Sequence, residues 1–188
     1  MQRQTAICLF LALFCICGRV GDVQVLPRLM GEAAAVFEVE TGRLLAGQNV
    51  YAPQPELLRA LLTALPACEE LDEAGWRDGG LAAVAKLAAA ALAQPAVRAE
   101  AERQQFLWRF PGATGLTAGY APEAGYSCIL TAMQDGIHLG VVVFGAGTEN
   151  HLWLDAVRWL DLGFRHYERL LEEPMIADGD GYRPSAHP

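Results

Sequence analysis

Residues 126–144 read YSCILTAMQDGIHLGVVVF, and this stretch decides the fold of the chain. Two apolar runs, Tyr126–Met133 and Ile137–Phe144, flank the dipeptide Asp135-Gly136, which is typical of a tight hairpin turn. The second run is β-branched and apolar on both faces, so we expect a strand that is covered on both sides. The stretch therefore predicts an antiparallel hairpin inside a layered domain.

A second hairpin is predicted at residues 33–48. Phe37 and Val39 alternate with glutamates, which is the period of a half-buried strand. The Thr-Gly pair at 41–42 favours a tight turn, and residues 43–48 can return as the partner strand.

Apolar residues at helical spacing predict helices at residues 57–65, 81–94 and 149–171. Residues 105–110 are expected to be extended. The predicted order is strand, strand, helix, helix, strand, strand, strand, helix. Hairpin connections favour antiparallel pairing, so we expect an α+β fold with an antiparallel sheet of about five strands and helices packed on its faces.

The N-terminus has the pattern of a targeting segment. Residues 1–18 carry one charge, Arg3, followed by an apolar run of twelve residues. That run is shorter than the ~20 residues of a membrane-spanning helix, so a signal peptide is expected, with an uncleaved N-terminal anchor as the alternative. We expect a single domain at residues 33–171 and a flexible tail at 172–188.

The overall charge restricts the partners. The chain has 188 residues, with 22 Asp and Glu against 14 Lys and Arg, and a formal net charge of −8. Because nucleic-acid binding needs clustered basic residues, we expect no nucleic-acid partner. Contact with a membrane is expected only through residues 1–18, if they are not cleaved.

Three short stretches resemble one protein family. They are residues 35–45 (AVFEVETGRLL), 112–126 (GATGLTAGYAPEAGY) and 162–164 (LGF). In this order they resemble the serine-type D-alanyl-D-alanine carboxypeptidases, which are the low-molecular-mass penicillin-binding proteins. The resemblance covers residues 33–65 and 78–168. It implies a β-lactamase/transpeptidase-like fold, peptidoglycan maturation as the process, and a secreted or cell-envelope location in a bacterium.

The family's catalytic positions hold unreactive residues here. Its Ser-x-x-Lys motif, which supplies the nucleophile and its base, falls on Leu57 and Ala60. Its Lys-Thr-Gly motif falls on Thr117-Ala118-Gly119, so the cation is absent. Its Ser-x-Asn motif has no counterpart, and residues 66–80 are too few for the family's helical subdomain.

No shift of the alignment restores these motifs. The chain has one lysine, Lys86, and two serines, Ser127 and Ser185, and neither serine has a lysine three positions later. Such residues act as a unit, so their loss is expected to abolish acyl transfer. We therefore expect a pseudoenzyme with no catalytic residue.

The resemblance also suggests where a ligand would bind. The family's substrate lies against the strand that carries Thr117, Gly119 and Tyr120, and a strand edge can pair with an extended peptide. The expected partner is a peptidoglycan stem peptide or an envelope protein. The alternatives are a structural, partner-dependent remnant without a ligand, or a residual serine-type carboxypeptidase as the family label would imply.

Cysteines and histidines leave further alternatives open. Cys68 and Cys128 lie outside residues 1–18 and either form a disulfide or remain free thiols. No cluster has the spacing of metal ligands, so we expect no metal and no cofactor. A residual hydrolase could use Cys128 or one of the histidines, which are His138, His151, His166 and His187.

Overall fold

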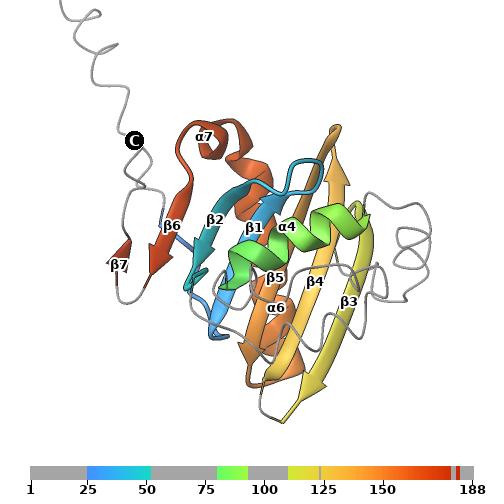
Figure 1. Cartoon of the computed structure of the whole chain (residues 1–188), viewed down its shortest axis with the longest axis vertical. Coiled ribbons are helices and arrows are strands. Elements are labelled where there is room, and N and C mark those ends of the chain that lie inside the picture. Colours follow the sequence, from blue (N-terminus) through green and yellow to red (C-terminus); the bar gives the residue numbers. More distant parts are fainter. Residues whose placement is uncertain (1–24, 52–79, 93–109, 123, 179–180, 183–188) are drawn as a thin grey trace, which may run out of the picture.

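The computed structural model describes residues 25–51, 80–92, 110–122, 124–178 and 181–182. These residues form one sheet with the strand order β3-β4-β5-β1-β2-β6-β7 (Figure 1). The strands are β1 Ala33–Glu38, β2 Leu44–Gln48, β3 Ala113–Ala121, β4 Gly125–Gln134, β5 Ile137–Ala146, β6 Met175–Asp178 and β7 Gly181–Tyr182. The helices are α4 Gly80–Leu92, α6 Glu149–Arg165 and α7 Tyr167–Glu172.

The hairpin predicted at residues 126–144 is confirmed as β4 and β5. Asp135 and Gly136 have φ angles of 50° and 81°, the left-handed backbone that a two-residue hairpin turn requires. β1 pairs antiparallel with the other side of β5. The valines at 141–143 therefore lie in the centre of the sheet and are fully buried, as expected for a strand covered on both faces.

Helices cover the two faces of the sheet, with α4 in front and α6 behind in Figure 1. On one face α6 contributes Trp159 and Leu160 to a core built with alternate residues of β4 and β5. On the other face α4 contributes Leu81 and Val84 to a second core built with the intervening residues. The predicted α+β class with helices on both faces of the sheet is confirmed.

The sheet differs from the expectation in strand number and in one pairing direction. It has seven strands instead of about five, and β6 runs parallel to β2. The two additional strands, β6 and β7, come from the segment 172–188, for which we expected a tail. They have four and two residues, and β6 pairs in parallel with β2 rather than through a hairpin, so no periodicity in the sequence marks them.

A buried carboxylate fixes the chain just before β1. The Asp155 side chain, on α6, is fully buried. Its Oδ2 accepts hydrogen bonds from the backbone N–H groups of Met30 at 2.9 Å and Gly31 at 2.8 Å. Buried charge is tolerated where hydrogen bonds satisfy it, so Asp155 anchors residues 30–31 to α6.

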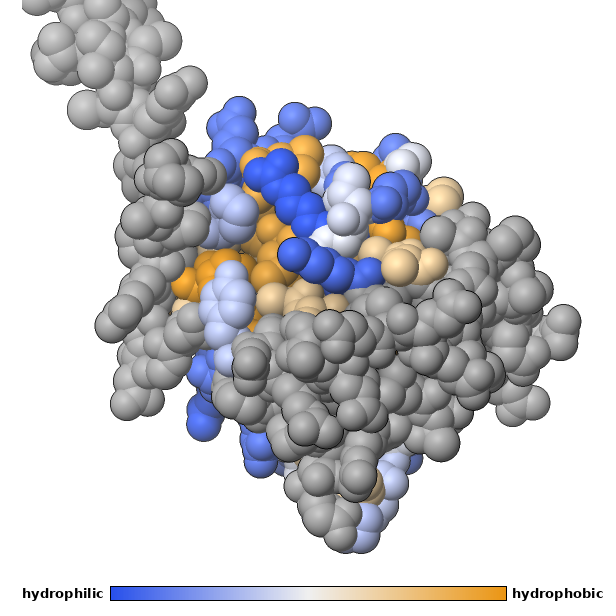
Figure 2. Space-filling view, viewed as in Figure 1, coloured by the Kyte–Doolittle hydropathy of each residue, from blue (hydrophilic) through white to orange (hydrophobic). Residues whose placement is uncertain are grey.

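The face that carries α4 also exposes some apolar surface. Figure 2, in the same view, shows hydrophobic residues among hydrophilic ones near β2 and β6. Leu44 of β2 and Ile176 of β6 are half-buried and pack against the α4 core. This surface lies at the far end of the strand order from β3.

Several predictions lie outside the described residues. They are the targeting segment at 1–18, the helix at 57–65 with Leu57 and Ala60, most of the short connection at 66–80, and the extended segment at 105–110 except Phe110. Among the helices that are described, none is both long enough and apolar enough to cross a membrane.

Candidate peptide-binding edge

The predicted binding residues Thr117, Gly119 and Tyr120 all lie on β3, the first strand in the sheet order. Thr117 pairs with Ile129 and Gly119 with Ser127 on β4. Within the described residues, β3 has a strand neighbour on this side only. An edge strand presents backbone N–H and C=O groups that can pair with another extended chain.

One face of β3 has open space at Gly119. A Cβ placed on Gly119 would have no atom within 4 Å. The next residue, Tyr120, is 62% exposed, and its ring lies 4.8 Å from that of Tyr126, centroid to centroid. The strand therefore offers an open position at Gly119 beside an aromatic pair that borders it.

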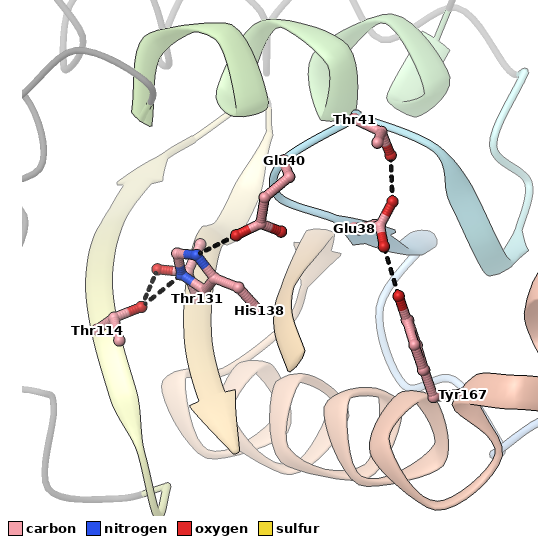
Figure 3. Close-up of polar contacts among 7 residues, drawn as sticks. All are labelled: Glu38, Glu40, Thr41, Thr114, Thr131, His138 and Tyr167. Atoms are coloured by element: carbon pink, nitrogen blue, oxygen red, sulfur yellow. Dashed lines mark hydrogen bonds and ion pairs between the residues drawn. The ribbon is translucent and has the colours of Figure 1, made fainter. Parts of the chain in front are cut away.

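A β-bulge occurs near the start of β3. The register passes from Ala113 opposite Ala132 to Gly115 opposite Thr131, so Thr114 is the extra residue. Bulges turn a side chain out of the regular alternation and are common beside functional sites. Thr114 Oγ1 lies 3.0 Å from Thr131 Oγ1 and 2.9 Å from His138 Nε2 (Figure 3).

The His138 ring links this bulge to the turn after β1. His138, on β5, is 4% exposed, and its Nδ1 lies 3.2 Å from Oε1 of Glu40, whose side chain is 57% exposed. At the other end of the network, the buried Thr131 hydroxyl donates to the carbonyl oxygen of Gly115 at 3.3 Å. A carboxylate, an imidazole, two hydroxyls and a backbone carbonyl thus form a continuous chain of contacts.

Sequence reasoning placed His138 in the middle of a strand but missed this network. Its members come from three strands and a turn, and Thr114 joins them only because the bulge alters the alternation of β3. The available signal was the pair of polar residues, Thr131 and His138, inside two otherwise apolar runs.

A second polar network fixes the other side of the β1–β2 turn. Glu38 accepts hydrogen bonds from Thr41 Oγ1 and Tyr167 Oη, each at 2.5 Å (Figure 3). The Thr41 bond, then the Tyr167 bond, lowers the pKa of the Glu38 carboxyl. The bond to Glu38 raises the pKa of Tyr167 to about 12. This network ties the turn to α7, away from the edge strand β3.

The alternative nucleophile, Cys128, lies in an unreactive environment. It is a free thiol on β4, 1% exposed, and burial raises its pKa to about 12. Because the thiolate is the nucleophile, a buried thiol with a raised pKa is inert. Its predicted alternative partner, Cys68, lies outside the described residues.

The three described histidines lie on different parts of the fold. His151 lies in the first turn of α6 and His166 between α6 and α7, whereas His138 lies on β5 and His187 is outside the described residues. In the part of the chain that is described, no group of three or more His, Cys, Asp or Glu could hold a metal ion.

The architecture matches that of the penicillin-binding proteins. A D-alanyl-D-alanine carboxypeptidase from Mycobacterium tuberculosis superposes with a TM-score of 0.59 at 16% identity, covering 77% of this chain and 95% of the other. Penicillin-binding protein 6B from Escherichia coli gives a TM-score of 0.61 at 14% identity, covering 78% and 81%. Penicillin-binding protein D2 from Listeria monocytogenes gives 0.57 at 17% identity, covering 75% and 100%.

These likenesses confirm the fold that the short motifs implied. The chain has a β-lactamase/transpeptidase-like sheet, with the order and helical layers described above. No family model matches the sequence, and no curated protein matches it. At these identities, shared architecture carries no information about activity.

Proposed function

We propose that this chain is a non-catalytic relative of the D-alanyl-D-alanine carboxypeptidases that binds an extended cell-wall peptide along β3 at the bacterial envelope. The observation that carries the proposal is the edge strand itself. It corresponds to the stretch that resembles the family's substrate-facing strand, and it is open at Gly119.

The residues argue against acyl transfer. The nucleophile and base positions hold Leu57 and Ala60, and the position of the lysine on the third motif holds Thr117. The thiol of Cys128 is buried and its pKa is raised to about 12. A labelled β-lactam is therefore expected to leave no adduct on this chain, and an adduct mapped to it would restore the catalytic alternative.

Binding by strand addition uses the backbone as its main source of affinity. A strand that lacks a cation and a nucleophile can still supply these N–H and C=O groups. The open position at Gly119 leaves room for a ligand side chain on that face of the sheet, and the exposed ring of Tyr120 borders it. The missing lysine removes the charge that would hold a terminal carboxylate, so we expect weak binding.

The test is co-sedimentation of the full chain with isolated peptidoglycan, with a soluble peptide ending in D-Ala-D-Ala as the competitor. The proposal expects binding that the peptide competes away. The variant Gly119→Val should weaken it at least about tenfold, because the added side chain occupies the open position without disfavouring a strand.

Gly147→Val is the matched control. A Cβ at Gly147 also meets no atom within 4 Å, but this residue follows β5 and lies off the edge strand. Equal losses in the two variants, or binding that the peptide does not compete away, would refute the proposed site. No binding by the wild-type chain would favour the structural, partner-dependent alternative, which association in size-exclusion chromatography would then support.

A further inference from the structure

The network at the start of β3 contains four contacts that each need a proton between two heavy atoms. They join Glu40 to His138, His138 to Thr114, Thr114 to Thr131, and Thr131 to the Gly115 carbonyl. Their lengths run from 2.9 to 3.3 Å, so all four are within hydrogen-bond range. We refer to them as the four-contact network.

The proton count of this network does not balance with a neutral imidazole and an ionised carboxylate. The carboxylate and the backbone carbonyl, at the two ends, only accept. The two threonine hydroxyls supply one proton each, and a neutral imidazole supplies one more. Three protons are available for four contacts, so one contact has no hydrogen between its two atoms. A fourth proton, on the ring or on the carboxylate, completes all of them.

We propose that the four-contact network holds the start of edge strand β3 in place only when it carries an additional proton. We call this proton-dependent restraint the lock. With the additional proton, donors run in one direction from the His138 ring through Thr114 and Thr131 to Gly115, while Glu40 accepts from the ring or shares the proton with it. Without that proton, one contact opens. The lock therefore closes as the pH falls and loosens as the pH rises.

Burial makes the missing contact significant. His138 and Thr131 are 4% and 2% exposed, so solvent has little access to either side chain. A polar group left unpaired in such surroundings is costly. Glu40 is the exposed end of the network and gives the added proton a route to water.

Among the side chains around the His138 ring, Glu40 is the charged group that contacts it. Thr114 from β3 and Thr131 from β4 are uncharged. The neighbouring elements also carry Lys86, whose Cα on α4 lies against Gly42 of the β1–β2 turn, and Asp135 in the exposed β4–β5 turn.

Because the lock lies at the start of β3, its opening affects the edge strand. Thr114 is the bulge residue and Gly115 follows it, so the network joins the start of β3 to β4, β5 and the turn after β1. Opening one contact releases the part of the strand that leads to Thr117. Only the resulting pH dependence of peptide binding rests on the proposed function; the lock itself does not.

The test is amide hydrogen exchange of the full chain between pH 5.5 and pH 8, without ligand and corrected for intrinsic exchange rates. Protection of the first amides of β3 in the wild type should fall roughly fivefold as the pH rises, the equivalent of one hydrogen bond. Amides in the centre of β5 should not follow this change, since they lie outside the network.

The decisive variant is Glu40→Gln. An amide at position 40 can donate to an unprotonated Nδ1, so the neutral ring donates from Nε2 and all four contacts close without an added proton. We expect high protection that no longer varies with pH. A loss of protection in this variant would instead indicate a simple ion pair between Glu40 and His138.

His151→Gln is the matched control, because it removes a histidine on α6 and leaves the network intact. This variant should keep the wild-type pH profile. Protection of β3 that stays constant with pH in the wild type, or that varies equally in Glu40→Gln, would overturn the proposal. Because no ligand is present, failure of peptide binding would leave this result unaffected.

Discussion

Two carboxylates of this molecule hold chain segments in place by different means. Asp155 is fully buried and accepts from backbone N–H groups of residues 30–31. Glu40 is exposed and contacts the ring of a buried histidine. Backbone donors keep their protons at every pH that a folded protein meets, whereas an imidazole does not. The donors of the Asp155 anchor are therefore fixed, whereas the Glu40 contact depends on the protons of its partner ring.

The largest expected effect comes from breaking the Asp155 anchor. Asp155→Ala removes the buried carboxylate that accepts from the N–H groups of Met30 and Gly31, which should cost about 2–4 kcal/mol of unfolding free energy. Urea unfolding at neutral pH measures this loss.

Asp161→Ala is the control for this variant. Asp161 lies on the same helix but pairs with Arg165 at the surface, where an ion pair contributes about 0.5 kcal/mol or less. If the two variants lost similar stability, the buried carboxylate of Asp155 would contribute no more to the unfolding free energy than the exposed one of Asp161.

A smaller effect, with a distinct pH signature, is expected from Thr131→Val. This isosteric change removes two of the four contacts and should cost about 1 kcal/mol at pH 5.5. The remaining contacts join Glu40 to His138 and His138 to Thr114. A neutral ring and one hydroxyl supply both protons, so these two contacts should persist at both pH 5.5 and pH 8.

The wild type supplies the reference for that measurement. A network that takes up a proton on folding stabilises the protein at low pH and loses this contribution as the pH rises. The stability difference between wild type and Thr131→Val should therefore shrink toward pH 8. A difference that is constant with pH would show that the hydroxyl has a structural role alone.

The fold could be predicted from local pattern to a large extent. The turn at Asp135-Gly136 and the valines at 141–143 require a buried hairpin, and the structure has one. The strand order could not be read in the same way, because β1 inserts beside β5 and β6 joins β2 in parallel across long stretches of chain. Such pairings depend on tertiary packing rather than on periodicity.

The strand that carries the candidate residues could be predicted, but the network beside it could not. Thr117, Gly119 and Tyr120 were assigned to a strand edge from the family resemblance, and they lie on β3 at the edge of the described sheet. The network behind that edge depends on a one-residue bulge at Thr114. A single added residue changes which side chains face each other, and no pattern in the sequence marks it.

The smallest expected effect concerns a third carboxylate, Glu38, which accepts hydrogen bonds from Thr41 and Tyr167. Its hydrogen bonds from Thr41 and Tyr167 lower its pKa, so it stabilises the fold above the ordinary glutamate range near ~4.3 and loses this contribution as the pH falls through its lowered pKa. The same bond raises the pKa of Tyr167 to about 12, so the contribution is also lost as the pH rises from ~10 toward that value. Tyr167→Phe should cost about 0.5–1 kcal/mol at neutral pH, because the site is partly exposed. Urea unfolding at pH 3, 7 and 11 should show that cost shrinking at both extremes, and a cost that stays constant would mean that the tyrosine contributes through packing of its ring alone.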